Sequence, residues 1–125
     1  TMTLKDLEKE LYAFSFELGI DIETFQSNFE GEIVEKIHSS KDNFDGIIIN
    51  AGAYTHTSIA IRDAISSINV PTVEVHMTNI YKREEFRHHS YLAGVCVGQI
   101  SGFGINSYKL GIKAVVDYIN TNDNE

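Results

Sequence analysis

Apolar residues recur near the start of the chain at alternating steps of three and four, which is the spacing of one face of an α-helix. They are Leu4, Leu7, Leu11, Phe14 and Leu18. Thr3 with Asp6 three residues later has the pattern of a capping box, and Gly19 follows the last apolar position as a helix stop. An amphipathic helix over residues 4–18 is therefore predicted.

Strand-like and helix-like patterns alternate along the rest of the chain. The predicted strands are residues 20–26, 47–49, 72–77 and 94–100. The predicted helices start at Phe29, span 58–67 and 105–119, and include a short helix or turn over 83–91, with a frayed end at 120–125. The isoleucine run at 47–49 is continuous, as in strands covered on both faces. This alternation predicts an α/β domain with a parallel sheet and right-handed crossovers.

The predicted order begins with a helix. A helix on a parallel sheet normally crosses over from an earlier strand, and none precedes Leu4. We therefore expect a leading strand and its loop to be missing from this sequence, together on the order of 15 to 25 residues by usual element lengths. Residues 1–125 are expected to form a single domain that is incomplete at its N-terminus.

Composition narrows the class of protein. A chain of 125 residues with 42% hydrophobic residues fits one globular domain. Its formal charge of -8 argues against nucleic-acid binding, which needs a basic surface. No stretch reaches the ~20 apolar residues of a membrane span and no signal pattern opens the chain, so a cytoplasmic protein without a membrane partner is expected. The only cysteine, Cys96, lies in an apolar run and is predicted to be buried and inert.

Polar residues concentrate in residues 45–91, which hold all three arginines and four of the five histidines. Two predicted strands end there, at Asn50 and at His76. Because open parallel sheets bind ligands at the carboxyl ends of their strands, we expect a site at this edge. Gly52 lets the backbone approach a ligand, and Asn50 and His56 offer hydrogen bonds. Stabilisation of the loop by Asn50 and helix capping by His56 are the structural alternatives.

Two pairs of residues suggest acid catalysis and anion binding. Strand alternation points Glu74 and His76 to the same side, and a carboxylate beside an imidazole fixes its tautomer and favours the protonated form of a general acid. Arg83 and Arg87 share a face if their segment is helical, and together they suit an anion. For an isolated pair of either kind, a structural role or a solvated face is the commoner meaning.

Two other patterns are weak. The segment from Gly102 to Gly104 lacks the third glycine of a dinucleotide-binding loop. His88 and His89 are adjacent, and adjacent residues do not share a helix face, so they make a poor pair of metal ligands. No metal site is predicted.

Three motifs taken together are more specific than any one of them. N-A-G-A-Y-T-H-T-S-x-A-I-R-D-A from position 50, E-V-H-M-T-N from 74 and R-E-E-F-R-H-H-S-Y from 83 resemble the type II 3-dehydroquinate dehydratases, and the resemblance covers most of residues 4–110. It implies a flavodoxin-like three-layer domain that dehydrates 3-dehydroquinate to 3-dehydroshikimate in the shikimate pathway of aromatic amino acid biosynthesis. It also implies a homo-oligomer, with trimers assembled to a dodecamer, and a lyase that uses neither a metal nor an organic cofactor.

The resemblance assigns roles to individual positions. His76 matches the general acid that protonates the departing C1 hydroxyl, Glu74 the residue that orients it, and Asn50 a residue that helps hold an ordered water. The implied substrate-binding groups are the backbone amides of Met77 and Thr78 for the carboxylate, His56 and Arg87 for the ring hydroxyls, Arg83 in the same region, and Asp63, which reaches a neighbouring subunit's site.

This sequence departs from the family pattern in two ways. Thr78 stands where serine is usual, which preserves the hydroxyl and the backbone N–H. The family's N-G-P-N-L-N strand and the following loop with its arginine and tyrosine base are expected before Thr1, so the printed chain lacks the group that takes the C2 proton. The alternatives are a non-catalytic flavodoxin-like binding or signalling module, such as a receiver domain, and a metal-dependent hydrolase that uses the histidines.

Overall fold

The computed structural model describes residues 2–123 and contains one parallel sheet in the order β1-β2-β3. Its strands are β1 (Ile47–Ile49), β2 (Thr72–His76) and β3 (Gly98–Ser101). The α-helices are α1 (Leu4–Leu18), α2 (Glu30–Ser39), α3 (Ile59–Ser67) and α4 (Asn106–Asp123). Short 3-10 helices are η1 (Gly52–His56), η2 (Ile80–Lys82), η3 (Glu85–His88) and η4 (Ala93–Val95). The predicted α/β class with a parallel sheet is confirmed.

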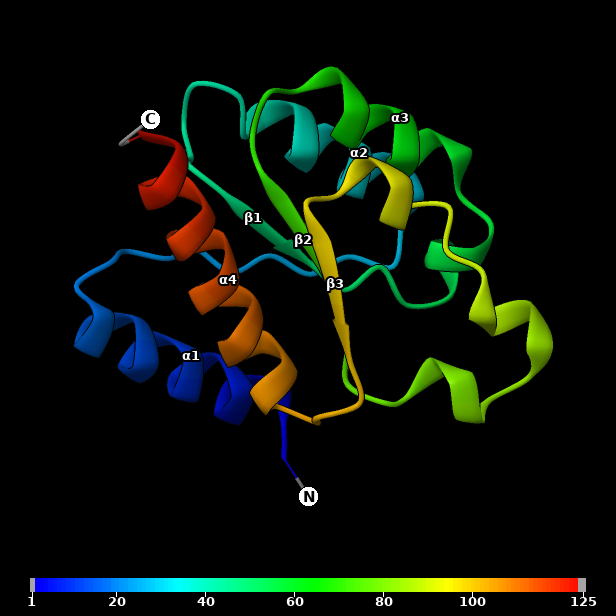
Figure 1. Cartoon of the computed structure of the whole chain (residues 1–125), viewed down its shortest axis with the longest axis horizontal. Helices are drawn as coiled ribbons and strands as arrows, with labels where there is room; N and C mark the ends of the chain where they lie inside the picture. The colour runs from blue at the N-terminus through cyan, green and yellow to red at the C-terminus, as the bar shows by residue number, and fades with distance from the viewer. Residues whose placement is uncertain (1, 124–125) are drawn as a thin grey trace.

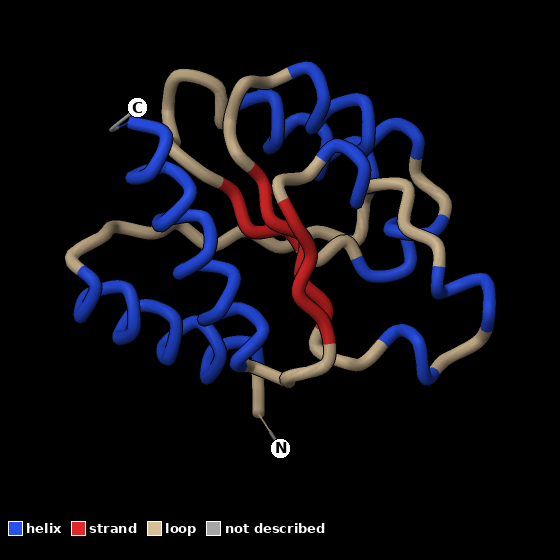
Figure 2. The backbone as a smooth tube through the Cα atoms, in the orientation of Figure 1, coloured by secondary structure: helices blue, strands red, loops and turns tan. Residues whose placement is uncertain are grey.

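Helices cover both faces of the sheet, with α2 and α3 on one side and α4 on the other (Figure 1, Figure 2). On the first face, Ile49 of β1 packs with buried residues of α2 and α3. On the second, Val73 and Val75 of β2 pack against Val115 of α4, with Ile48 beside them. Neighbouring residues of β1 therefore belong to different cores, as expected of a strand covered on both faces.

A glycine brings α4 close to the sheet. A Cβ atom on Gly111 would lie 2.8 Å from Cγ1 of Val75 and 3.3 Å from Cγ2 of Ile48. These separations are too short for carbon atoms, whose favourable contact distance is about 3.5–4.0 Å. The backbone of α4 therefore approaches β1 and β2 more closely here than an alanine would allow.

The predicted ends of the first helix are confirmed. Thr3 Oγ1 accepts a hydrogen bond from the Asp6 amide at 3.1 Å, and the Thr3 amide donates to Asp6 Oδ2 at 3.0 Å. Hydrogen bonding of the Asp6 carboxyl to the Thr3 backbone amide, and to a smaller extent to the Thr3 side chain, lowers the pKa of this exposed group. Gly19 ends the helix with a φ of 74°, a left-handed conformation that glycine adopts without steric cost.

One predicted strand and two predicted boundaries are wrong. Residues 20–26 pair with no strand of the described sheet, although exposure alternates from Ile20 to Thr24 as in an extended segment. A strand needs ladder bonds to a neighbour as well as an extended backbone. The last strand begins at Gly98, opposite Val73, because residues 93–95 form a helical turn. Helix α4 continues through residues 120–122 to Asp123, beyond the predicted stop, while positions 124–125 lie outside the described residues.

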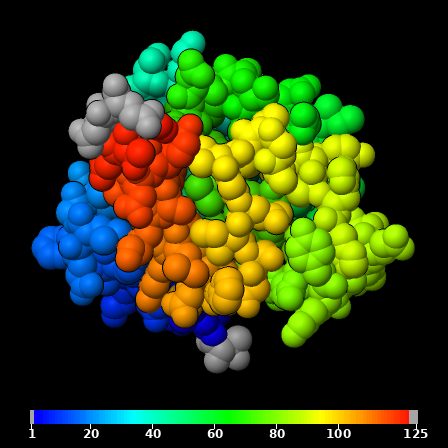
Figure 3. Space-filling model, in the orientation of Figure 1, coloured from blue at the N-terminus to red at the C-terminus, as the bar shows by residue number. Residues whose placement is uncertain are grey.

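The segment between β2 and β3 forms a lobe away from α1 and α4, coloured green to yellow in the space-filling view (Figure 3). The turn after β3 ties the end of β2 in place, since the Gly102 amide donates to the carbonyl of His76 at 3.1 Å and the Gly104 amide to that of Met77 at 2.8 Å. Both glycines have positive φ, 102° and 59°. No helix among residues 2–123 is long and apolar enough to cross a membrane.

Candidate active site

A buried carboxylate and imidazole meet at the end of the central strand. Glu74 and His76 are two apart on β2, so their side chains leave the same face, and His76 Nε2 lies 2.5 Å from Glu74 Oε2. Glu74 is fully buried at 0% exposure and His76 is 6% exposed. The predicted orientation of this pair is confirmed. No residue among 2–123 bonds Nδ1 of His76, which leaves this ring nitrogen to meet a ligand.

Two further donors complete the surroundings of the carboxylate. Ser90 Oγ donates to Glu74 Oε1 at 2.9 Å, and Gln99 Nε2 donates to Oε2 at 2.9 Å. Burial alone would raise the pKa of Glu74, but the hydrogen bonds from His76, Gln99 and Ser90 outweigh burial and hold the pKa below its ordinary value. Glu74 is therefore an ionised partner for His76 at neutral pH.

A pocket of about 230 Å³ opens above His76, at the carboxyl ends of β1 and β2. This is the edge where parallel sheets bind ligands. Its lining consists of Asn50, Gly52, Ala53, His56, His76, Met77, Thr78, Ile80, Arg83 and Arg87. The structure thus brings together seven of the nine predicted site residues in one lining, with Glu74 behind His76.

Asn50 and His56 are held in fixed orientations beside His76. Asn50 Oδ1 accepts from the Gly52 amide at 3.1 Å, and its Nδ2 donates to the Tyr108 hydroxyl at 2.8 Å. His56 Nδ1 donates to the carbonyl of His89 at 2.8 Å, so Nε2 remains for a ligand. The rings of His56 and His76 are stacked, with centroids 6.4 Å apart and an interplanar angle of 18°.

Two arginines give the pocket local positive charge in a chain whose formal charge is -8. The short helix predicted within residues 83–91 is η3, but Arg83 caps η2 and lies outside it, so the condition for a common helical face with Arg87 is not met. Arg87 Nε donates to Glu84 Oε2 at 2.8 Å, and this bond is the main cause that lowers the pKa of the exposed Glu84. The pocket nevertheless presents two guanidinium groups, which suits an anionic ligand.

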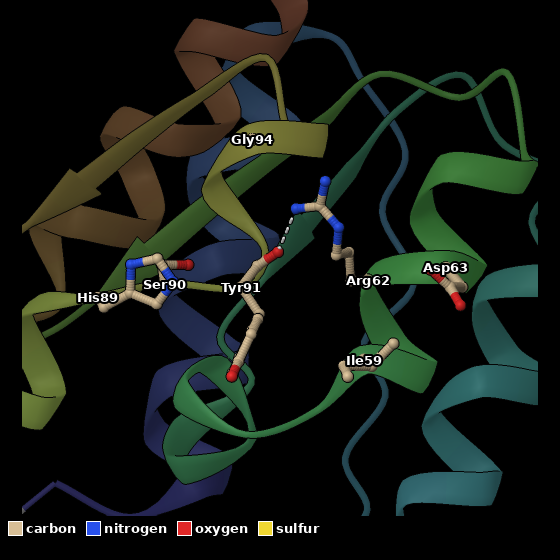
Figure 4. Close-up of a pocket in the computed structure, with 7 residues that line it drawn as sticks. All are labelled: Ile59, Arg62, Asp63, His89, Ser90, Tyr91 and Gly94. Atoms are coloured by element: carbon tan, nitrogen blue, oxygen red, sulfur yellow. Dashed lines mark hydrogen bonds between the residues drawn. The ribbon is translucent and has the colours of Figure 1, made fainter.

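Asp63 lies elsewhere. It lines a second pocket, of about 560 Å³, together with Arg62, Tyr91 and Gly94 (Figure 4). Arg62 extends from α3 and donates through a terminal nitrogen to the Tyr91 carbonyl at 2.8 Å, while Asp63 projects from the same helix in another direction (Figure 4). Asp63 and His76 of one chain therefore do not line the same pocket.

The remaining chemistry-bearing residues form no further centre. Among residues 2–123, no group of three histidines, cysteines, aspartates or glutamates is arranged to hold a metal ion. Gly102 and Gly104 belong to the turn that holds the end of β2. Cys96 is half-buried, so the prediction that it is buried is wrong. Burial, with a smaller effect from the Glu74 carboxylate, nevertheless raises the pKa of its thiol to about 12, which agrees with the predicted low reactivity.

Residues 1–116 match the model of the family described as dehydroquinase class II. The chain belongs to the class II dehydroquinase family. A 3-dehydroquinate dehydratase from Trichodesmium erythraeum is 59% identical over 119 residues, which are 95% of this chain and 79% of that protein. One from Carboxydothermus hydrogenoformans is 50% identical over 99% of this chain and 80% of its own length.

Solved class II dehydroquinases share the fold. The type II dehydroquinase from Propionibacterium acnes aligns with a TM-score of 0.87 and 38% identity, over 96% of this chain and 81% of that one. The enzyme from Butyrivibrio crossotus aligns with a TM-score of 0.89 and 42% identity, over 91% of this chain and 80% of its own. The predicted flavodoxin-like α/β fold is therefore confirmed.

Sequence reasoning missed three residues that touch this dehydroquinase site: Ser90, Gln99 and Tyr108. Each contacts a predicted residue that is distant in the sequence, Glu74 or Asn50. The sequence offered one sign of such a residue, which is a polar side chain at an inward-facing position of an otherwise apolar strand. Gln99 stands beside Ile100 on β3 in that way, but only the register of the sheet shows that it faces Glu74.

Proposed function

We propose that this chain is a hydro-lyase that converts 3-dehydroquinate to 3-dehydroshikimate in the shikimate pathway. The observation that carries the proposal is the buried Glu74–His76 pair beneath a pocket lined by two arginines, in a member of the class II dehydroquinase family. A binding module would need the pocket but would have no use for an ionised carboxylate aimed at an imidazole.

The acid step follows from this geometry. Removal of a proton next to a ketone produces an enolate, and expulsion of hydroxide from it needs an acid on the opposite face for an anti elimination. Glu74 accepts from Nε2 of His76 and stabilises the imidazolium, while Nδ1 delivers the proton to the departing C1 hydroxyl. Asn50 helps to hold an ordered water at the leaving-group side.

Substrate binding uses the rest of the lining. The backbone amides of Met77 and Thr78, directly after β2, bind the carboxylate of 3-dehydroquinate. His56 and Arg87 bind the ring hydroxyls, with Arg83 beside them. The two guanidinium groups attract an anion locally, although the chain as a whole is acidic. At physiological salt, screening limits the repulsion between the acidic surface and an anion to about 8 Å, so the local attraction can dominate inside the pocket.

The base that takes the C2 proton is a separate part of the proposal. Among residues 2–123, the side chains that line the pocket include no tyrosine. The prediction that a tyrosine base and a leading strand precede Thr1 stays a prediction. By resemblance we also propose that copies assemble as trimers and then as a dodecamer in the cytoplasm, with Asp63 reaching a neighbouring copy's pocket.

The test is the ultraviolet absorbance of the enone formed from 3-dehydroquinate, measured for the wild type and for His76→Ala. General acid catalysis contributes about 10²- to 10⁴-fold, so turnover should fall by that factor. His38→Ala, at an exposed histidine on α2, is the matched control and should keep wild-type turnover. The proposal is wrong if the wild type turns over 3-dehydroquinate and His76→Ala does so at the same rate.

An intact mass of the same sample separates the two parts of the proposal. The printed sequence has a mass of 14.0 kDa. Turnover by a sample of that mass would show that the base lies within the printed residues. If a 14.0 kDa sample binds 3-dehydroquinate without turning it over, the acid and binding half is present and the base is not.

A further inference from the structure

We propose that Gln99 and Ser90 are positioning residues for the acid: their side chains hold Glu74 ionised and fix the orientation in which it accepts the hydrogen of His76. This inference rests on the proposed function for its catalytic meaning. Its structural part is that His76, Gln99 and Ser90 contact one buried carboxylate. These contacts exist whether or not the chain turns over substrate.

The sheet register places Gln99 opposite the glutamate. Glu74 and Gln99 are paired positions on the neighbouring parallel strands β2 and β3, so their side chains stand on the same face. Gln99 Nε2 donates to Oε2, the same oxygen that accepts from His76. An amide nitrogen donates and does not accept, so this contact requires an acceptor on Glu74.

The other hydrogen bonds of Ser90 leave its hydroxyl only the role of a donor to Glu74. Its Oγ accepts from the amides of Leu92 and Ala93, both at 3.0 Å. The single hydroxyl hydrogen is then left for Glu74 Oε1, 2.9 Å away. Because a hydroxyl carries one hydrogen and two acceptor sites, this arrangement uses all three.

Ser90 and Gln99 therefore both contact the carboxylate as donors, and His76 Nε2 lies beside it as a third partner. A protonated carboxyl would carry a hydrogen of its own and would lose acceptor capacity, so this surrounding selects the ionised form. The donors also reduce the tendency of Glu74 to take the proton from His76. The proton then stays on the imidazole, where the elimination needs it.

Other charged or titratable groups lie farther from the carboxylate. His56 stacks on His76, Arg83 and Arg87 line the pocket on the ligand side, and the Cys96 thiol is close enough to Glu74 for the carboxylate to raise its pKa. Within residues 2–123, none of these four side chains donates a hydrogen bond to Glu74. Because Glu74 is 0% exposed, bulk water does not replace a donor that is removed.

Gln99→Met is the decisive variant, because methionine has a similar length and no donor. The first readout is the ¹³C titration of the Glu74 carboxyl, and the second is the pH profile of kcat/KM. A hydrogen bond to a charged group corresponds to about one pKa unit or more, so both the Glu74 titration and the acid limb should move up by about one pH unit. KM at neutral pH should stay unchanged.

Two further variants distinguish positioning from a structural effect. Ser90→Ala should move the acid limb of the pH profile in the same direction as Gln99→Met. Ser90→Thr keeps a hydroxyl, so its acid limb should stay at the wild-type position. Ile100→Val changes the neighbouring residue of β3, which packs into the core on the opposite face, and it should leave the acid limb in place.

The proposal is overturned if Gln99→Met leaves the Glu74 titration unchanged, or if Ile100→Val moves it as far. The carboxyl titration needs no turnover. A wild-type chain without dehydratase activity would therefore contradict the proposed function, while the titration would still decide the role of Gln99 and Ser90.

Discussion

At the scale of single residues, Glu74 is a buried carboxyl whose pKa is held down because Ser90 and Gln99 donate to it and His76 lies beside it. A buried charge is costly unless hydrogen bonds and a partner compensate it. Ser90 and Gln99 supply that compensation from two other parts of the chain. The charge is thus a product of the tertiary structure and does not follow from the local E-x-H pattern.

The lowered pKa of Glu74 makes its contribution to stability depend on pH. Because the folded-state pKa lies below the unfolded value of about 4.3, the contribution is present above that pH and is lost as the pH falls through the folded-state pKa. We therefore expect the difference in unfolding free energy between the wild type and Glu74→Gln to shrink as the pH falls below about 4.3. Urea unfolding at a series of pH values measures it.

Glu17→Gln, at an exposed position of α1, is the control for this series. Surface substitutions usually change stability by no more than about 0.5 kcal/mol, so its difference from the wild type should stay small throughout. A difference for Glu74→Gln that grows as the pH falls would contradict the expected direction.

The predictable part of the site is the part encoded within a strand or directly after one. Strand alternation was enough to place Glu74 and His76 side by side, and the ends of β1 and β2 were enough to place Asn50 and the pocket. Gln99 was not predictable, because its contact depends on which residue of β3 lies opposite Glu74. Local patterns predict a face, whereas register sets the partner.

At the scale of elements, the fit of α4 onto the sheet depends on Gly111. Glycine in a helix interior costs roughly 1 kcal/mol relative to alanine, so its presence here has a packing reason. The backbone of α4 lies against Val75 and Ile48, where a Cβ has no room. The segment 20–26 is the opposite case, since its alternating pattern predicted a strand and the described sheet gives it no partner.

Gly111→Ala should destabilise the chain although alanine favours helix. Overpacking of a core costs typically 1–3 kcal/mol, which exceeds the gain in helix propensity of about 1 kcal/mol. The matched control is Gly31→Ala in α2, where a new Cβ meets nothing within 4 Å. That variant should be more stable than the wild type by about 0.5–1 kcal/mol. Chemical denaturation of both variants checks the pair, and the opposite order of stability would refute the packing argument.

At the scale of the whole molecule, the predicted residues divide between two pockets. His76 and the two arginines line one, while Asp63 lines the other, with Arg62. Each pocket is lined by residues of one copy of the chain. If Asp63 serves catalysis, as the resemblance implies, it does so in the pocket of another copy.

Mixing two inactive variants tests that arrangement. We expect Asp63→Ala and His76→Ala each to lose activity when assembled alone. When the two chains are expressed together, about a quarter of the sites should combine an intact His76 with an intact Asp63 from a neighbour, and activity should return in that proportion. Asp117→Ala, at an exposed position of α4, should retain activity alone. Mixed assemblies without activity would count against a shared site.

Cys96 has a practical consequence. It is the single cysteine of the chain, and burial together with Glu74 raises its pKa to about 12. Alkylating reagents react with the thiolate, so the raised pKa slows the reaction of this half-buried thiol at neutral pH. A reporter dye attached through an added surface cysteine would leave this native thiol largely unlabelled.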